Sequence, residues 1–172
     1  MPVPIRMTKI HHACLTIDDG STRLLLDPGQ LGPRPSLDAV TAVLITHRHV
    51  DHLDPELVAE ALRRGIPVWA PGDALGDIGV PDGIEDGGLH EAVPGTTLRI
   101  GSLSVQVAGE RHAELHPALP GPENRAYLID QRLFVTGDEH PVPPGRLTTL
   151  VTPADAPWLR ATDLIRYVRD VR

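Results

Sequence analysis

Three histidines and one aspartate lie within six residues of this chain, directly after the apolar run from Ala42 to Thr46: His47, His49, Asp51 and His52. Residues two apart on an extended chain point to the same side, so His47 and His49 can reach one point in space. Asp51 and His52 lie where the chain turns and can face a second point nearby. Imidazole and carboxylate are the ligand types that suit zinc, or iron and manganese where carboxylates supply a larger share of the ligands. The segment predicts a metal site at a strand end; the alternative is a set of solvated histidines.

The residues on either side of this motif predict a strand before it and a helix after it. A continuous apolar run such as residues 42–46 is typical of a strand that is buried on both faces. Asp54 can cap a helix whose first position suits Pro55, and Gly65 is a suitable end. The metal-binding segment is therefore expected to connect a buried strand to a helix.

The rest of the chain predicts short strands and few helices. The turn signal over residues 18–21 separates two β-like runs, Leu15–Ile17 and Arg23–Leu26, and indicates a hairpin. An amphipathic helix is expected from Thr162 to Val171, with Leu164, Ile165 and Val168 on one face. Further strands are expected at 67–70, 97–100, 103–108, 126–129 and 133–136, and irregular structure at 71–88 and 117–122. No linker divides the chain, so we expect a single α/β domain over residues 1–172.

The composition limits the partners and the location. Sixteen Lys and Arg against 23 Asp and Glu give a formal net charge of −7, which argues against binding nucleic acid by general electrostatic attraction. Cys14, the only cysteine, is expected in the core and excludes a cysteine-based metal cluster. No apolar stretch reaches the ~18 residues that a membrane span needs. We therefore expect a cytoplasmic protein that acts on a small molecule, without a membrane or nucleic-acid partner.

The motif His-x-His-x-Asp-His at the end of an apolar strand resembles the signature of the metallo-β-lactamase superfamily, and further segments follow in the family's order. Residues 26–29 resemble its early aspartate motif, which contains Asp27. Residues 109–113 resemble the segment that supplies a third histidine, His112, and residues 134–138 the segment that supplies a bridging aspartate, Asp138. Residues 10–14 and 112–117 are most similar to the branch of the UlaG-type lactonases. The resemblance covers nearly the whole chain and implies an αββα sandwich.

The resemblance implies a role for each of these residues. His47, His49 and His112 would bind a first metal ion, and Asp51 and His52 would contribute to a second, with Asp138 bridging the two. Asp27 would brace the metal-binding loop. Asp51 would also be the catalytic residue, which orients the attacking water or accepts its proton. The implied cofactor is zinc, one or two ions per chain, with manganese or iron as alternatives.

The end of the chain departs from the family's pattern. The family places a last histidine, a ligand of the second metal, on a strand after its C-terminal helix, whereas this sequence ends at Arg172. We therefore expect a sandwich without the final strand, a weaker second metal site, and a homodimer that covers the exposed sheet edge. A truncated form of a longer chain is the alternative.

Other histidines have more than one interpretation. His12 either lies near the site, as the resemblance implies, or is buried and bonded to a backbone carbonyl. His116 is expected to line the pocket or support a ligand. His140 either replaces the missing ligand or is exposed to solvent. His11 should alternate with His12 on a strand and point away from it, and His90 is expected on the surface.

The resemblance thus implies a hydrolase that activates a metal-bound water to cleave a small ester, lactone or phosphodiester. The first alternative is a catalytically weak metal-binding protein that acts in binding or assembly. The second is a nuclease of the same superfamily, which the charge of −7 disfavours. A serine hydrolase is disfavoured because the sequence contains no Gly-x-Ser-x-Gly segment. The substrate depends on residues 71–88 and 113–125, whose shape the pattern does not define.

Overall fold

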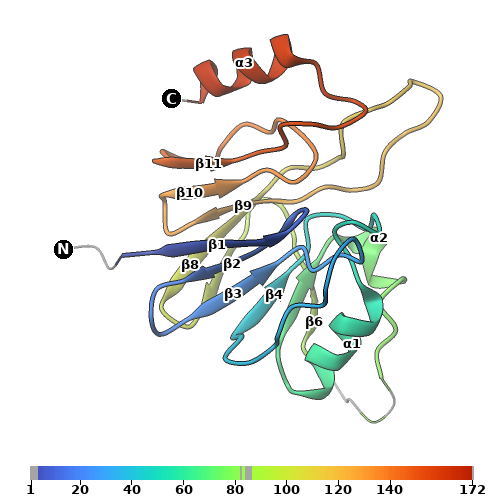
Figure 1. Ribbon diagram of the computed structural model, residues 1–172, viewed down its shortest axis with the longest axis vertical. Helices are drawn as coiled ribbons and strands as arrows, with labels where there is room; N and C mark the ends of the chain where they lie inside the picture. The colour runs from blue at the N-terminus through green and yellow to red at the C-terminus, as the bar shows by residue number, and fades with distance from the viewer. Residues whose placement is uncertain (1–3, 82, 84–86, 172) are drawn as a thin grey trace.

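The computed structural model describes residues 4–81, 83 and 87–171, whose strands form two sheets (Figure 1). The first sheet follows the chain order: β1 (Arg6–His11), β2 (Cys14–Asp18), β3 (Arg23–Leu26), β4 (Ala42–Leu44), β5 (Val68–Ala70) and β6 (Leu89–Glu91). The second has the order β11 (Thr149–Val151), β10 (Leu133–Val135), β9 (Ala126–Ile129), β8 (Leu103–Ala108) and β7 (Thr97–Ile100). The helices are α1 (Pro55–Arg63), α2 (Gly72–Leu75) and α3 (Ala161–Asp170). This arrangement confirms the expected α/β sandwich.

The direction of pairing changes across the first sheet. Strands β1, β2 and β3 are antiparallel, and the turn at residues 18–21 joins β2 to β3 as predicted. Strands β3, β4, β5 and β6 are parallel, and α1 connects β4 to β5. Because β3 and β4 are parallel neighbours, the residues that follow them, Asp27 and Thr46, leave the sheet at the same edge. This pairing brings two distant parts of the predicted site together.

One hydrophobic core lies between the two sheets. It contains buried side chains from the first sheet, such as Leu24, Leu26 and Leu44, and from the second, such as Val105, Tyr127 and Val135. A separate core between the first sheet and α1 contains Val43, Val58 and Leu62. Val43 and Leu44 of β4 thus face different cores, which explains why this strand is continuously apolar.

Helix α1 begins as the sequence predicts. Asp54 is the N-cap, and its side chain accepts hydrogen bonds from the backbone N–H groups of Glu56 and Leu57 at 3.1 and 3.3 Å. Removal of such a cap costs about 1 kcal/mol. The N–H of Asp54 also donates to the carbonyl of Pro28 at 2.9 Å, so the start of α1 is attached to the loop that carries Asp27.

Three short elements were not predicted: β6, β11 and α2. Strands β6 and β11 each lie at the edge of a sheet, and their residues are exposed or half-buried. They form by pairing with β5 and β10 and need no apolar pattern of their own. Helix α2 is a single turn within residues 71–88, which were expected to be irregular.

Two predicted details are wrong. Strand β1 ends at His11, and His12 lies in the turn between β1 and β2 rather than on the strand. In α3, Ile165 is 52% exposed and Tyr167 is the buried residue. The hydroxyl of Tyr167 donates to the carbonyl of Pro141 at 2.8 Å, so this buried hydroxyl has a hydrogen-bond partner.

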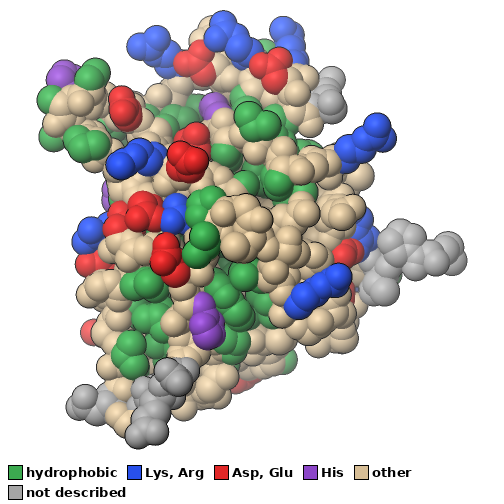
Figure 2. Space-filling model, turned by 180° about the vertical axis from the view of Figure 1, so that it is seen from behind, with side chains coloured by type: hydrophobic (Ala, Val, Ile, Leu, Met, Phe, Trp, Pro, Cys, Tyr) green, Lys and Arg blue, Asp and Glu red, His purple; other side chains and the backbone are tan. Residues whose placement is uncertain are grey.

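The outer surface of α3 is charged. Figure 2 shows side chains of both charges at the top of the molecule, over this helix. Arg166 and Asp163, one turn apart, form an ion pair at 3.8 Å. Within the described part of the chain, no helix is long and apolar enough to cross a membrane.

Candidate metal centre

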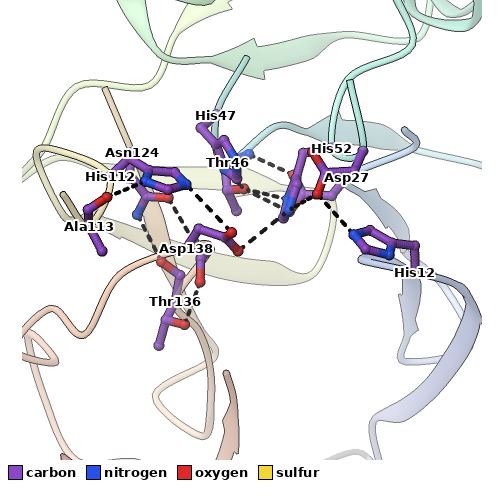
Figure 3. A network of polar contacts seen from close by, with 12 residues as sticks. His12, Asp27, Thr46, His47, His52, His112, Ala113, Asn124, Thr136 and Asp138 are labelled. Atoms are coloured by element: carbon purple, nitrogen blue, oxygen red, sulfur yellow. Dashed lines mark hydrogen bonds and ion pairs between the residues drawn. The ribbon is translucent and has the colours of Figure 1, made fainter. Parts of the chain in front are cut away.

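The segments that follow β4, β8 and β10 meet at one place, although they are far apart in the sequence (Figure 3). Two hydrogen bonds join the end of β4 to the start of β9. The N–H of Arg125 donates to the carbonyl of Thr46 at 2.7 Å, and the hydroxyl of Tyr127 donates to the carbonyl of Ile45 at 2.6 Å. Since β4 and β9 belong to different sheets, these bonds fix the two sheets to each other next to the site.

His47, His49 and His112 form a first cluster. Each offers one ring nitrogen, and these three atoms lie within 4.8 Å of one another. The ring centroid of His47 is 4.8 Å from that of His49 and 4.9 Å from that of His112. His47 and His112 are buried, whereas His49 is exposed. These histidines could hold a metal ion together, and the ion would be open to solvent on the side of His49.

Asp27 holds two histidine rings in place, that of His52 directly and that of His47 through Thr46. Its carboxylate accepts hydrogen bonds from the N–H and the hydroxyl of Thr46, both at 2.7 Å, and from Nδ1 of His52 at 2.8 Å. Because the Thr46 hydroxyl donates its proton to Asp27, it accepts the hydrogen bond from Nδ1 of His47 at 3.0 Å. Both rings therefore carry their proton on Nδ1 and present Nε2 to the centre. Such contacts fix the tautomer and orientation of metal-binding histidines.

The residues of the first cluster fit a divalent metal ion. Nε2 of His47 is buried and, within the described residues, has no hydrogen-bond partner, a condition that costs about 1–3 kcal/mol and that a cation would relieve. Burial, followed by the neighbouring imidazoles, lowers the pKa of His47 well below its ordinary value, so the ring is neutral. Nδ1 of His112 donates to the carbonyl of Ala113 at 2.7 Å, which leaves its Nε2 to bind a metal ion. Neutral imidazoles are the form that zinc binds.

A second cluster lies beside the first. The ligand atoms of His12, Asp51 and His52 are also within 4.8 Å of one another. Asp138 lies between the clusters: its Oδ1 is 3.5 Å from Nε2 of His52, and its Oδ2 is 3.5 Å from Nε2 of His112. Its two oxygens therefore face different clusters (Figure 3), which is the placement that the resemblance implies for a bridging aspartate.

The charged groups of the centre shift one another's pKa. Burial alone would lower the pKa of His52, but the carboxylates of Asp27, Asp138 and Asp51 outweigh burial and raise it. Burial would raise the pKa of Asp138, but its contact with His112 and the charge of His52 hold it below its usual value. Negative charge therefore gathers around the imidazoles, as a cation site requires.

Two residues that support Asp138, Asn124 and Trp158, had no signal in the local sequence. The side chain of Asn124 donates to the carbonyl of Thr136 at 2.9 Å and accepts the N–H of Asp138 at 3.0 Å. Gly137 allows this contact, because its φ is +62° and a Cβ there would lie 2.3 Å from Oδ1 of Asn124. The indole N–H of Trp158 donates to Oδ2 of Asp138 at 3.4 Å. Asn124 and Trp158 come from other segments of the chain, so only the fold reveals their contact with Asp138.

His116 and His140 lie outside the clusters. Among the described residues, the groups that could hold a metal ion contain neither of them. His116 is exposed, and its Nδ1 accepts the N–H of Ala118 at 3.1 Å, within its own loop. The ring of His140 stacks on Tyr167, with centroids 4.4 Å apart, and lies 5.4 Å from the ring of Trp158. His140 is thus a half-buried part of an aromatic stack rather than a replacement ligand or a solvated residue.

The remaining histidines are His12, His11 and His90. His12 is exposed, and its Nε2 lies 2.9 Å from Oδ2 of Asp51, so it contacts the centre and is not bonded through its ring to a backbone carbonyl. The ring of His11 packs against Gly32, where a Cβ would lie 2.4 Å from it. His90 is exposed on β6, as expected.

A surface pocket of about 530 Å³ opens beside the centre. The metal-binding motif, α2 and the loop before β9 form its wall, with Arg48, His49, Val50, Asp51, Asp73, Pro120, Gly121 and Pro122 as lining residues. Arg48 forms an ion pair with Asp77 at 2.8 Å. Both segments that were expected to determine the substrate, 71–88 and 113–125, contribute to this wall. A small molecule in the pocket would contact residues of both clusters.

The two sheets and the His/Asp centre define a protein of the metallo-β-lactamase fold. The chain belongs to the β-lactamase superfamily, because the family model described as "Beta-lactamase superfamily domain" matches residues 6–172. Protein Rv0786c of Mycobacterium tuberculosis is 31% identical over 175 residues, which are 97% of this chain and 79% of that protein. The predicted family is confirmed, while the branch of the UlaG-type lactonases stays a prediction.

Solved structures share the fold at low identity. Igni18, a metallo hydrolase from the archaeon Ignicoccus hospitalis, has a TM-score of 0.51 at 18% identity, over 76% of this chain and 59% of that chain. CmlA, a diiron β-hydroxylase from Streptomyces venezuelae, has a TM-score of 0.53 at 19% identity, over 84% of this chain and 31% of that chain. This chain therefore spans less than two thirds of either protein, and the likeness shows the fold alone.

Proposed function

We propose that this protein is a metal-dependent hydrolase that cleaves a small ester, lactone or phosphodiester in the pocket beside His49. The observation that carries the proposal is the convergence of anchored imidazoles on one point, with the unpartnered Nε2 of His47 among them. In this proposal one metal ion is held by His47, His49 and His112, and a second involves Asp51 and His52, with Asp138 between them. Zinc is the proposed metal, with manganese or iron as alternatives.

A bound divalent cation would supply Lewis-acid catalysis and would lower the pKa of a water molecule. The residues of the chain orient the metal-binding rings and the attacking water. Asp27 and Thr46 hold two rings in one tautomer. Asp51 lines the pocket with a side chain that is 26% exposed, so it can reach both the attacking water and the substrate. We assign to Asp51 the role of orienting that water or accepting its proton.

Hydrolysis assays on the metal-loaded protein test this proposal. The protein is stripped, loaded with zinc, manganese or iron(II), and assayed on p-nitrophenyl acetate, a small lactone and bis(p-nitrophenyl) phosphate. We expect metal-dependent turnover of at least one of these classes, and its loss in His49→Ala. His49 is exposed, so this truncation leaves no buried cavity. His90→Ala, also at an exposed histidine, is the matched control and should keep full activity.

Two results would count against the proposal. Stable metal binding without turnover of any of the three classes would favour the alternative of a binding or assembly protein. Undiminished turnover in His49→Ala would show that the reaction does not use this centre.

A further inference from the structure

His12 has an unusual backbone conformation for a side chain that approaches the centre. It lies in the turn between β1 and β2 with a φ of +34°, after a register shift between Lys9 and His11. Residues other than glycine adopt this region at a cost in free energy, and such residues cluster at active sites and ligand-binding segments. The ammonium group of Lys9 contacts the carbonyl of His12 and helps to hold this turn. The conformation directs the imidazole towards Asp51.

The donor atoms around His12 have the spacing of ligands to one metal ion. Nε2 of His12 is 2.9 Å from Oδ2 of Asp51, and that oxygen is 3.6 Å from Nε2 of His52. Nε2 of His52 is 3.5 Å from Oδ1 of Asp138. Two ligands that each bind a tetrahedral zinc ion at 2.0–2.1 Å lie about 3.3 Å apart. The three distances lie on either side of this value, and the ligand atoms of His12, Asp51 and His52 all lie within 4.8 Å of one another. Small movements of these three side chains bring their atoms to one ion, and Asp138, whose Oδ1 is 3.5 Å from Nε2 of His52, moves towards the same ion to bind it.

We propose that His12 is a direct ligand of the second metal ion, together with Asp51, His52 and one oxygen of Asp138. The inference rests on the proposed function only in assuming that the centre binds metal. The N-terminal hairpin then supplies a fourth ligand to the second site, which needs no histidine from elsewhere. The side chain of His12 is 45% exposed, so this ion lies at the solvent side of the centre.

Metal stoichiometry tests the proposal without reference to activity. Stripped wild-type protein is titrated with Zn²⁺ and with Co²⁺, and bound metal is measured by plasma mass spectrometry after gel filtration. We expect two ions per chain in the wild type, and one tightly bound ion in His12→Ala with at least tenfold weaker binding of the other. The ion that remains shows that the first cluster is folded. His90→Ala, at an exposed histidine away from the centre, should bind two ions.

His12→Gln separates a ligand from a residue that only orients Asp51. Its amide N–H can replace the hydrogen bond to Asp51, but an amide is a much poorer zinc ligand than an imidazole. We expect His12→Gln to lose the second ion as His12→Ala does. The proposal is overturned if either variant binds two ions with wild-type affinity, if His12→Gln alone keeps them, or if the wild type binds only one. An inactive protein that shows the expected stoichiometry would overturn the hydrolase proposal and leave this one standing.

Discussion

Asp27 shows how one residue that does not reach the metal position controls the centre. Three donors face its carboxylate: the N–H and hydroxyl of Thr46 and Nδ1 of His52. In Asp27→Asn, an NH₂ group replaces one carboxylate oxygen. This NH₂ group is a donor that faces another donor, so at least one of these hydrogen bonds is lost. We expect metal affinity to fall about 10- to 100-fold, measured by competition with a chromogenic chelator.

A matched variant controls for the loss of charge. Asp18 forms an ion pair with Arg23 at 2.8 Å, in the hairpin between β2 and β3 and not in either cluster. Asp18→Asn should bind metal as the wild type does. Equal affinities in the Asp18 and Asp27 variants would show that the carboxylate behind the histidines has no role.

Cys14 shows the effect of burial on a reactive group. It has no exposed surface, as expected for a core residue. Burial, and then the charge of Asp27, raise the pKa of its thiol to about 12. Since the thiolate is the reactive form, we expect no reaction with Ellman's reagent in the native protein at pH 8 and complete reaction in guanidinium chloride. Rapid labelling of the native protein would contradict the buried placement.

At the scale of elements, the centre depends on contact between two loops, the one after β3 and the one after β4. The N–H of Gln30 donates to the carbonyl of Val50 at 2.7 Å. Gly29 makes this approach possible, since a Cβ there would lie 2.0 Å from the backbone oxygen of Asp51. Backbone cannot move away as a flexible side chain can. The loops must separate if this position carries a side chain.

Gly29→Ala should therefore both destabilise the protein and weaken metal binding. Overpacking of this kind costs about 1–3 kcal/mol or more, which urea denaturation measures, and metal titration reports the displaced ligands. Gly76→Ala is the control, because Gly76 has helical angles and a Cβ there would meet no atom of the surrounding described chain within 4 Å. Similar behaviour of the two variants would contradict the close contact at Gly29.

At the scale of the whole molecule, metal binding should stabilise the fold because the ligands come from both sheets and meet only in the folded chain. At a metal concentration of 100 times Kd, binding to the folded state adds about 2.7 kcal/mol. For a chain of this size, that raises Tm by about 5–11 °C. Scanning calorimetry with zinc and after EDTA measures the shift. His49→Ala removes a ligand of the first ion only, so it should show a smaller shift, and an equal shift in that variant would place the stabilising metal elsewhere.

The homodimer stays a prediction. Light scattering coupled to size-exclusion chromatography tests it directly, with metal present and after EDTA. We expect a mass of twice the 18.6 kDa chain, and a single-chain mass at micromolar concentration would contradict the prediction.

Local pattern determined the parts of the centre that are close in the sequence. The apolar run of β4 and the cap at Asp54 place the motif between a strand and a helix. Alternation and strand-end position then direct His47 and His49 to one point. These features depend on backbone periodicity and on hydrogen bonds between near neighbours, so a single sequence carries them. The resemblance to a family added His112 and Asp138, which no local pattern connects to the motif.

The tertiary structure decided which residues support these ligands. Asp27 meets Thr46 because β3 and β4 pair in parallel, and Trp158 reaches Asp138 from the segment before α3. It also placed His12 beside Asp51 and His140 in an aromatic stack, two outcomes that the sequence left open. The edge strands β6 and β11 form by pairing with a neighbour rather than by burying an apolar face. Each of these contacts depends on sheet register and on packing between distant segments, and neither is encoded in the residues of one segment alone.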